Sequence, residues 1–342
     1  MIDLRPTPEQ EQVVASVADF LSAELPGERL LPKPLSVLND DRAKWAQMGE
    51  LGFFGLGLTE EQGGVGYTVI EEALISREFG RYLVSPNALA TLLGAHVAAL
   101  AGDETLTAGI VAGEAKVSIA NPFTIQDTDE PTGDHHLIDA RDARWLVFWN
   151  QKGAGLFPKD AFEDVREVEP VDASITLERG FLKGAKAPLW VAFETDDIPR
   201  RADLLAAAYL VGMAEATRDA SVEYAKIREQ FDQKIGSFQA VKHRCADMAL
   251  RASAAWSQTV FAALSARDQR ADAGFHVHAA RLIAAEGALK NAAVNIHNHG
   301  GIGFTGENLA HHYLKRGHIL DRIGGGAARQ ASLFLAQGGP LQ

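Results

Sequence analysis

The sequence predicts a mainly α-helical protein with a small β domain between two helical parts. Apolar residues recur at helical spacing in the first and last thirds of the chain. Between about Lys116 and Glu194 they form short runs separated by Asp, Gly and Pro turns, which is typical of strands. We therefore expect an N-terminal helical domain over residues 1–115, a β domain over 116–195 and a C-terminal helical bundle over 196–342.

The first domain is expected to consist of helices interrupted by a glycine-rich loop. The segment EQEQVVASVADFLSAEL, residues 9–25, has apolar side chains on one helical face, namely Val13, Val14, Val17, Phe20 and Leu21. Glycines punctuate LGFFGLGLTEEQGGVGY, residues 51–67, and predict a loop there. Helical spacing resumes in TVIEEALISREFGR, residues 68–81, so this domain is predicted to be all-helical.

Strands are predicted in the middle domain and long helices after it. The predicted strands are KVSIA at 116–120, ARWLVFW at 143–149, GAGLFP at 153–158 and SITLE at 174–178. Long helical patterns follow at residues 202–231, 237–267 and 276–298. The last of these patterns is alanine-rich, as close packing of helices requires, so the C-terminal part is expected to form a bundle.

Composition and charge restrict the partners and the compartment. The 33 basic and 45 acidic residues give a formal charge of -12 without any basic stripe, which argues against a nucleic-acid surface. No stretch approaches the roughly 18 apolar residues that a membrane span requires. The single cysteine, Cys245, excludes an internal disulfide and fits a reducing compartment, so we expect a cytoplasmic protein. Cys245 lies in a helical pattern and is interpreted as a packing residue rather than a nucleophile.

Two motifs in the C-terminal part carry a family resemblance. The segment YAKIREQFDQKIGSFQAVKHRCADM, Tyr224 to Met248, joins R-x-x-F to a new helix that opens S-F-Q-x-x-x-H. Further on, HNHGGIGFTGENLAHHYLKR, His297 to Arg316, has a glycine-rich turn before L-x-R. Together with the loop at 51–67, these motifs resemble acyl-CoA dehydrogenases over nearly the whole chain. The resemblance implies that family's fold, with a reduced β domain and a C-terminal four-helix bundle.

The resemblance implies contacts to FAD across a subunit interface. In the family, the two C-terminal motifs reach the FAD that the neighbouring subunit holds. By resemblance these cofactor contacts belong to Arg228, Gln230, Phe231, Gln239, His297, Gly300 and Gly301. The residue types suit an anionic dinucleotide, because arginine offers a forked donor to pyrophosphate and glycine permits close backbone approach. His297 stands where glutamine is usual, and Asp232 stands where glycine is usual.

Each of these residues also has an ordinary structural interpretation. Arg228 could pair with Glu223 or Glu229 on a solvated face. A lone G-G-x-G is a common turn, and the one at Gly300 gains weight only from its distance to the first motif. The histidines of this segment lack a cysteine or carboxylate at ligand spacing, so no metal site is expected. They are His297, His299, His311 and His312.

The reaction that the resemblance implies requires a base that this sequence lacks. Family members remove the α-proton of an acyl-CoA thioester with a glutamate while a hydride passes to the flavin. At the two family positions for that glutamate this chain has Gly325, nine residues past Arg316, and Ala202. Asp203 is the nearest candidate, but a carboxylate at the start of an apolar helix is explained by the helix dipole alone. We therefore assign no catalytic residue.

The family residues that hold a subunit's own FAD are also missing. Where family members have T-E-P-x-x-G-S-D this chain has IANPFTIQDTDEP, and no W-I-T-[NS] strand follows. The G-T-S that follows the family glutamate is replaced by Gly326, Ala327 and Ala328. Contacts to a neighbour's FAD are thus retained, whereas contacts to the chain's own FAD are lost.

This contrast resembles the short subunit of heteromeric α2β2 steroid-CoA dehydrogenases. A longer, glutamate-bearing partner would then share its FAD and bind most of the acyl-CoA, a steroid side-chain thioester, with electron-transfer flavoprotein as the acceptor. There are two alternatives. One is a homo-oligomeric dehydrogenase with another base, Asp203 or an unrecognised carboxylate. The other is a flavin-free scaffold of the same fold.

Overall fold

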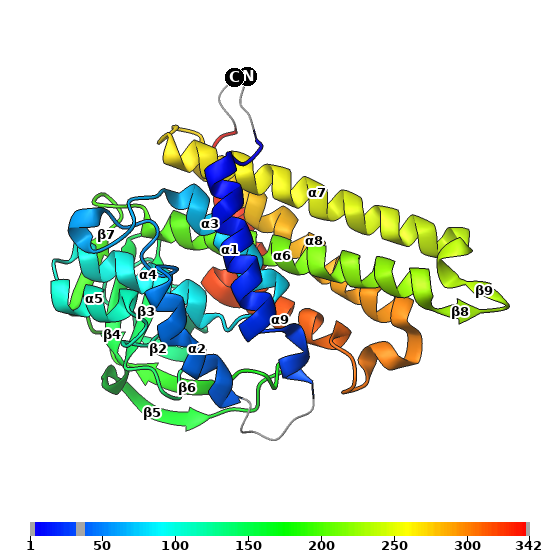
Figure 1. Ribbon diagram of the computed structural model, residues 1–342. Helices are drawn as coiled ribbons and strands as arrows, with labels where there is room; N and C mark the ends of the chain where they lie inside the picture. Colours follow the sequence, from blue (N-terminus) through cyan, green and yellow to red (C-terminus); the bar gives the residue numbers. More distant parts are fainter. Residues whose placement is uncertain (1–3, 32–37, 340–342) are drawn as a thin grey trace.

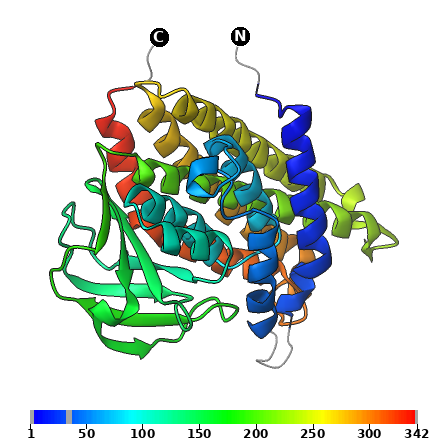
Figure 2. The ribbon, with the colours of Figure 1, turned by 60° about the vertical axis from the view of Figure 1, so that its left-hand side comes forward.

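The structure is a computed structural model that describes residues 4–31 and 38–339. Helices from both ends of the chain pack into one body, and a sheet covers one side of that body (Figures 1 and 2). The predicted class, mainly helical with a small β domain, is confirmed.

In the described residues, the N-terminal part consists of five helices, some of which begin with a side-chain cap. They are α1 Pro8–Glu24, α2 Leu38–Glu50, α3 Val69–Arg81, α4 Asn87–Leu100 and α5 Glu104–Val111, with 3-10 turns at Gly27–Leu30 and Glu60–Gln62. Side-chain caps begin α1, α3 and α5. Thr7 caps α1 and Thr68 caps α3, and in each case the side chain of the third helical residue, Gln10 or Glu71, accepts from the cap amide. The glycine-rich loop predicted at 51–67 lies between α2 and α3.

The described residues form one large sheet with seven strands in the order β5-β6-β2-β1-β3-β4-β7. The strands are β1 Val117–Pro122, β2 Gly133–Ile138, β3 Trp145–Asn150, β4 Gly153–Pro158, β5 Phe162–Glu167, β6 Leu177–Leu182 and β7 Leu189–Ala192. A 3-10 turn at Lys159–Ala161 precedes β5. Neighbouring strands are antiparallel except β1 and β3, which are parallel. The helix α4 packs on β1, β3, β4 and β7. Helix α6, residues Ile198–Ile227, also contacts β3 and β4.

The predicted strand at 174–178 overlaps β6 only at its last two residues, whereas β1, β3 and β4 lie where strands were predicted. Ser174 accepts a hydrogen bond from the guanidinium of Arg316, and the amide of Thr176 donates to Asp139. Because both residues serve tertiary contacts, the strand β6 begins only at Leu177. The strands β2, β5 and β7 were not predicted.

The C-terminal bundle is built around α6. Its elements are α6 Ile198–Ile227, β8 Glu229–Gln230, β9 Gln233–Lys234, α7 Gln239–Arg267, α8 Ala273–His299, α9 Ala310–Arg322 and α10 Gly326–Ala336. Short 3-10 turns lie at Ile235–Ser237, Gly300–Phe304 and Ile323–Gly325. Helix α6 packs on α3, α7 and α8. It approaches α3 so closely that a Cβ atom at Gly212 would lie 1.8 Å from the carbonyl oxygen of Arg77.

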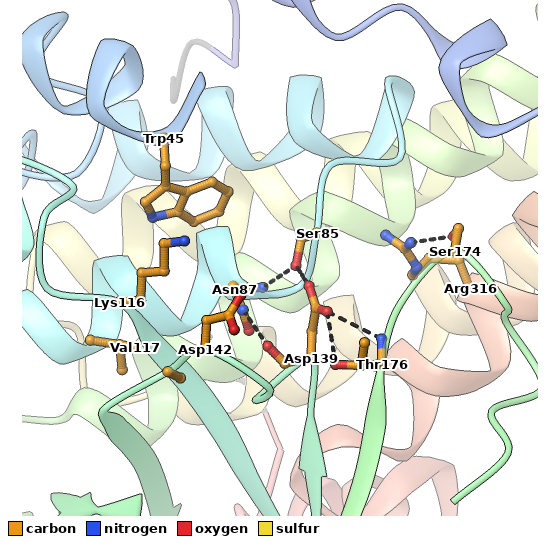
Figure 3. A pocket seen from close by; sticks show the side chains of 11 residues that line it. Trp45, Ser85, Asn87, Lys116, Val117, Asp139, Asp142, Ser174, Thr176 and Arg316 are labelled. Atoms are coloured by element: carbon orange, nitrogen blue, oxygen red, sulfur yellow. Dashed lines mark hydrogen bonds between the residues drawn. The ribbon is translucent and has the colours of Figure 1, made fainter. Parts of the chain in front are cut away.

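Arg316 joins the bundle to both other parts of the molecule. Its side chain is 1% exposed, and its guanidinium donates to Asp172 at 2.6 Å, to Ser174 at 2.9 Å and to the carbonyl oxygen of Val84 at 2.7 Å. Figure 3 shows this arginine beside a cavity of about 50 Å³ between the sheet and the helices. Burial alone would raise the pKa of Asp172, but the Arg316 charge and the hydrogen bonds lower it overall. The arginine of the L-x-R motif is therefore a structural residue here.

Candidate functional site

The seven residues predicted to contact FAD gather at one end of the bundle. Helices α6 and α8 end there and α7 begins there, while the β8–β9 hairpin projects beyond them (Figure 1). All seven are exposed, and we call them the bundle-end surface: Arg228, Gln230, Phe231, Gln239, His297, Gly300 and Gly301. Residues separated by up to 73 positions in the sequence (301 minus 228) thus share one surface.

Arg228 does not form the ion pairs that were considered for it. Glu223 pairs with Lys226 at 2.6 Å, and Glu229 pairs with Lys234 at 2.6 Å. Within the described part of the chain, the guanidinium of Arg228 has no hydrogen-bond or ion-pair partner. Its backbone amide still closes the last turn of α6 by donating to the carbonyl oxygen of Tyr224. An exposed and unpaired guanidinium at a fixed backbone position is available to an anion.

The hairpin turn places an aromatic ring at its tip. Phe231 and Asp232 have φ of 55° and 59°, so both central residues of the turn are left-handed, as in the type I′ hairpin. Such φ values favour glycine, which explains why glycine is usual at the Asp232 position. Phe231 is 86% exposed and meets only the edge of Phe238, with 6.2 Å between ring centroids. A strained turn therefore presents a large apolar side chain to the outside.

Two backbone segments complete the bundle-end surface. Helix α7 starts after Phe238 without a side-chain cap, so its positive end is left to solvent or to a ligand. Gly300 has φ 65° and ψ −143°, and a Cβ atom at Gly300 or Gly301 would meet nothing within 4 Å. The turn therefore leaves open space beside its backbone. An unpaired arginine, an uncapped helix start and an open glycine turn together suit the phosphates of a dinucleotide.

Neighbouring side chains crowd the two positions at which the resemblance placed the family glutamate. Gly325 has φ 100°, and a Cβ atom there would lie 2.5 Å from Cδ of Arg329 and 2.5 Å from Cδ1 of Ile125. Ala202, at the other family position, is 0% exposed inside the bundle. Neither position has room for a longer side chain without rearrangement of its neighbours.

A loop after β1 is tied down over the Gly325 position. The Arg329 guanidinium pairs with Asp127 at 2.6 Å. The side-chain amide nitrogen of Asn150 donates to the carbonyl oxygens of Gln126 at 2.7 Å and Thr128 at 2.6 Å. The Arg329–Asp127 ion pair and the Asn150 side-chain amide thus hold the loop from two sides. We call the residues involved the plug: Ile125, Asp127, Asn150 and Arg329. Sequence patterns gave no signal for it, because its members lie up to 204 positions apart (329 minus 125).

Asp203 is not the helix-start carboxylate that the sequence suggested. Helix α6 begins at Ile198, and Asp197 caps it by accepting from the amide of Arg200. Asp203 lies more than a turn further on, is 6% exposed, and accepts from Nε2 of Gln330 at 2.7 Å. Burial raises its pKa, although the charges of His278 and Arg281 oppose that effect. The carboxylate therefore serves internal contacts.

The structure also places the histidines that were considered for a metal site, and Cys245, which was considered as a nucleophile. Among residues 4–31 and 38–339, no group of three His, Cys, Asp or Glu side chains is arranged to hold a metal ion. Burial lowers the pKa of His312 to about 4, so this imidazole is neutral at ordinary pH. Cys245 is half-buried, and burial raises the pKa of its thiol, which makes it a poor nucleophile. No helix in the described part of the chain is long and apolar enough to cross a membrane.

Family models match both helical parts of the chain. The model of the acyl-CoA dehydrogenase N-terminal domain matches residues 7–112, and the model of the C-terminal domain matches residues 202–337. Acyl-CoA dehydrogenase FadE34 of Mycobacterium tuberculosis H37Rv is 33% identical over 298 residues, which cover 84% of this chain but only 41% of FadE34. Acyl-CoA dehydrogenase IpdE2 of the same organism is 30% identical over 318 residues, covering 91% of this chain and 92% of IpdE2.

Solved structures share the fold over the whole chain. A chain of the ChsE4-ChsE5 complex from Mycobacterium tuberculosis has a TM-score of 0.83 at 22% identity, covering 99% of this chain and 100% of that chain. A variant of the Tcur3481-Tcur3483 steroid ACAD has a TM-score of 0.85 at 22% identity, covering 96% of this chain and 97% of that chain. With both domain models matched and IpdE2 aligned over nearly its full length, this chain belongs to the acyl-CoA dehydrogenase family.

Proposed function

We propose that this chain is an accessory, non-catalytic subunit of a heteromeric FAD-dependent acyl-CoA dehydrogenase. Its bundle-end surface contacts FAD that a longer, glutamate-bearing partner subunit holds. The assembly introduces the α,β double bond into a steroid side-chain acyl-CoA thioester, which the partner binds for the most part. Electron-transfer flavoprotein is the proposed electron acceptor, and the cytoplasm is the proposed compartment.

The observation that carries the proposal is the contrast between two places in the chain. At the bundle end, Arg228 is exposed and unpaired, and the glycine turn is open. At Gly325, the side chains of Ile125 and Arg329 lie where the Cβ atom of a base would be. A chain that had lost its function by random change would not be expected to keep one surface open while packing the other.

The bundle-end surface and the Gly325 position differ in whether FAD could bind without displacing side chains. A flavin beside Gly325 would have to displace the plug, in which one ion pair and two hydrogen bonds hold the loop. At the bundle end an anionic dinucleotide meets the Arg228 guanidinium, which has no partner among the described residues, and the uncapped start of α7. We therefore assign the shared FAD to the bundle end and no FAD to the chain's own cleft.

The relatives support an assembly of unlike chains. The ChsE4-ChsE5 and Tcur3481-Tcur3483 structures each carry the names of two proteins, and the second is named a steroid ACAD. More than half of FadE34 lies outside the part that matches this chain. These comparisons motivate both the heteromer and the steroid substrate in the proposal.

Co-production tests the proposal. This chain is produced alone and together with a longer, glutamate-bearing acyl-CoA dehydrogenase homologue from the same genome. We expect a colourless single chain, and a complex that carries a single FAD per pair of chains and reduces an artificial acceptor with a steroid side-chain acyl-CoA. A single chain that is yellow and active alone would instead indicate the homo-oligomeric enzyme. A complex that forms but stays colourless would indicate a scaffold.

A further inference from the structure

An aromatic stack joins the two halves of the bundle-end surface. The ring of Tyr224, in the last turn of α6, stacks on the imidazole of His299, the last residue of α8. Their ring centroids are 4.2 Å apart and the ring planes differ by 24°. Stacked rings at this separation attract each other beyond the burial of their surface. The stack therefore holds the ends of α6 and α8 together.

The orientation of His299 is fixed by a second contact. Its Nδ1 lies 2.8 Å from the carbonyl oxygen of Asn295, which only accepts, so Nδ1 carries the proton. Asn295 is 1% exposed and in turn accepts from the hydroxyl of Ser221 at 2.8 Å. Ser221 lies on α6 and Asn295 on α8, so a buried hydrogen bond reinforces the stack one turn further into the bundle.

Tyr224 and His299 are each coupled directly to a proposed FAD contact. The carbonyl oxygen of Tyr224 accepts from the amide of Arg228 at 2.9 Å, so Tyr224 sets where that arginine leaves α6. His299 immediately precedes Gly300. The turn that follows folds back tightly, because a Cβ atom at Gly303 would lie 2.5 Å from the carbonyl oxygen of Ile296. The Tyr224–His299 pair thus sets the distance between Arg228 and the glycine turn that follows α8.

We infer that Tyr224 and His299 are positioning residues for the dinucleotide contacts of the bundle-end surface, an inference that rests on the proposed function. They touch no phosphate themselves. They hold Arg228 and the turn at Gly300 in the relative position that a ligand spanning both requires. Within the described residues the Tyr224 hydroxyl has no hydrogen-bond partner, so the side chain takes part through its ring and not through its hydroxyl.

The test compares Tyr224→Ala with Tyr224→Phe and with a matched control. The control is Phe261→Ala, which removes another aromatic contact to a histidine of α8, His276, at a centroid distance of 4.5 Å. In the single chain, hydrogen exchange of the amides at 300–303 is measured. In the complex with the longer subunit, the dissociation constant for FAD is measured by flavin fluorescence. Thermal unfolding is recorded for every variant, so that a general loss of stability is recognised.

We expect Tyr224→Ala to speed exchange at 300–303 and to weaken FAD binding, each by about threefold to tenfold, the range for one aromatic pair. Tyr224→Phe should match the wild type in both measurements. Phe261→Ala should lower the unfolding temperature without changing either of them.

Unchanged exchange in Tyr224→Ala would overturn the positioning role, as would equal effects of Tyr224→Ala and Phe261→Ala on FAD binding. The exchange measurement needs no partner subunit, so it decides this inference even if the proposed function fails. Faster exchange together with unchanged FAD binding would overturn the FAD contact assigned to the glycine turn and leave the mechanical role of the stack standing.

Discussion

The carboxylate of Asp203 lies between α6, α8 and α10, where Gln330 donates to it and His278 approaches to 3.7 Å. The buried guanidinium of Arg281 is close enough to influence its charge. Nε and Nη1 of Arg281 have no hydrogen-bond partner among the described residues, and Nη2 donates to the backbone carbonyl oxygens of residues 320, 321 and 323. The Asp203 carboxylate therefore supplies part of the compensation for this buried cation. In a pocket of this kind a carboxylate stabilises the fold and is not free to approach a substrate.

Asp203→Asn is therefore expected to change stability and not turnover. The amide retains an oxygen that accepts from Gln330, but the charge that compensates Arg281 is lost. We expect the free energy of unfolding to fall by about 1–3 kcal/mol. Urea unfolding of the single chain and turnover of the complex are the measurements. Asp197→Asn is the control, because asparagine also caps helices well. A fall in turnover by orders of magnitude would identify Asp203 as a base.

Residue types and spacing predicted the exposed residues better than the buried ones. The seven contacts of the bundle-end surface lie at one end of the bundle, as the resemblance implied, although their role stays a prediction. Asp203 was misplaced because helix starts depend on the cap, and Asp197 supplies it. The sequence predicted that Gly325 stands at the position of the family glutamate, and this stays a prediction. The crowding of this position could not be predicted, because it depends on Ile125 and Arg329.

Three consecutive glycines lead into α10 and set the direction in which this helix starts. Gly324, Gly325 and Gly326 all have φ between 72° and 100°, a region that other residues rarely adopt. This backbone lets α10 start so that Arg329 reaches Asp127. The plug and the glycine segment thus depend on each other.

Gly325→Ala should be more destabilising than an alanine at another glycine of positive φ. Both variants bear the cost of the left-handed backbone, roughly 1 kcal/mol. At Gly325 the new Cβ also meets two side chains at 2.5 Å, whereas at Gly338, with φ 72°, it meets nothing within 4 Å. Moving the Arg329 side chain aside disturbs its ion pair with Asp127, which adds up to about 1 kcal/mol. Urea unfolding of Gly325→Ala and Gly338→Ala is the comparison, and equal losses would show that the Gly325 position is not crowded.

The junction of α3, α4 and α6 depends on a buried glutamate. Glu72 is 1% exposed and accepts from Nε2 of His96 at 2.7 Å and from Nη1 of Arg201. Burial alone would raise its pKa, but the Arg201 and His96 charges and their hydrogen bonds lower the pKa from 4.5 to about 2. The folded state therefore favours the ionised carboxylate.

Glu72 predicts a specific acid sensitivity. Because its pKa is lower in the folded state, its contribution is present above the unfolded pKa of 4.5 and is lost as the pH falls towards 2. That interval corresponds to roughly 3 kcal/mol. Glu72→Gln should be less stable than the wild type at neutral pH and should approach it at low pH, as measured by urea unfolding. The exposed Glu163→Gln should show no such convergence. A constant difference across the pH range would contradict the lowered pKa.

At the scale of elements, strands were harder to predict than helices. The helices α1, α3, α7 and α8 lie within a few residues of their predicted ranges, because a long amphipathic face is a strong signal. The strand β5 is exposed at five of its six positions and has no apolar alternation to detect. The predicted helix at 202–231 ends instead at Ile227, because Arg228 is extended and leads into the hairpin. These differences arise from tertiary contacts and edge positions.

The whole molecule is expected to be incomplete as an enzyme, with one open surface and a crowded position at Gly325. The open surface is at the end of α6 and α8, and the plug is between the sheet and α10. A partner that covers the bundle end would bury the exposed ring of Phe231. It could also supply acceptors for the amides at the start of α7, where no side chain of this helix's N-cap accepts. The assembly, and not the single chain, is then the unit in which activity should be measured.

The most direct measurement is the affinity for FAD of the two-subunit complex that carries Arg228→Ala, with Lys226→Ala as the control. Lys226 is only two residues away but already pairs with Glu223 on the surface. Loss of an arginine that donates to a phosphate should weaken FAD binding about tenfold to hundredfold. The control should change it by less than about twofold. Equal FAD affinity in the wild-type and Arg228→Ala complexes would contradict a contact between this chain and its partner's FAD.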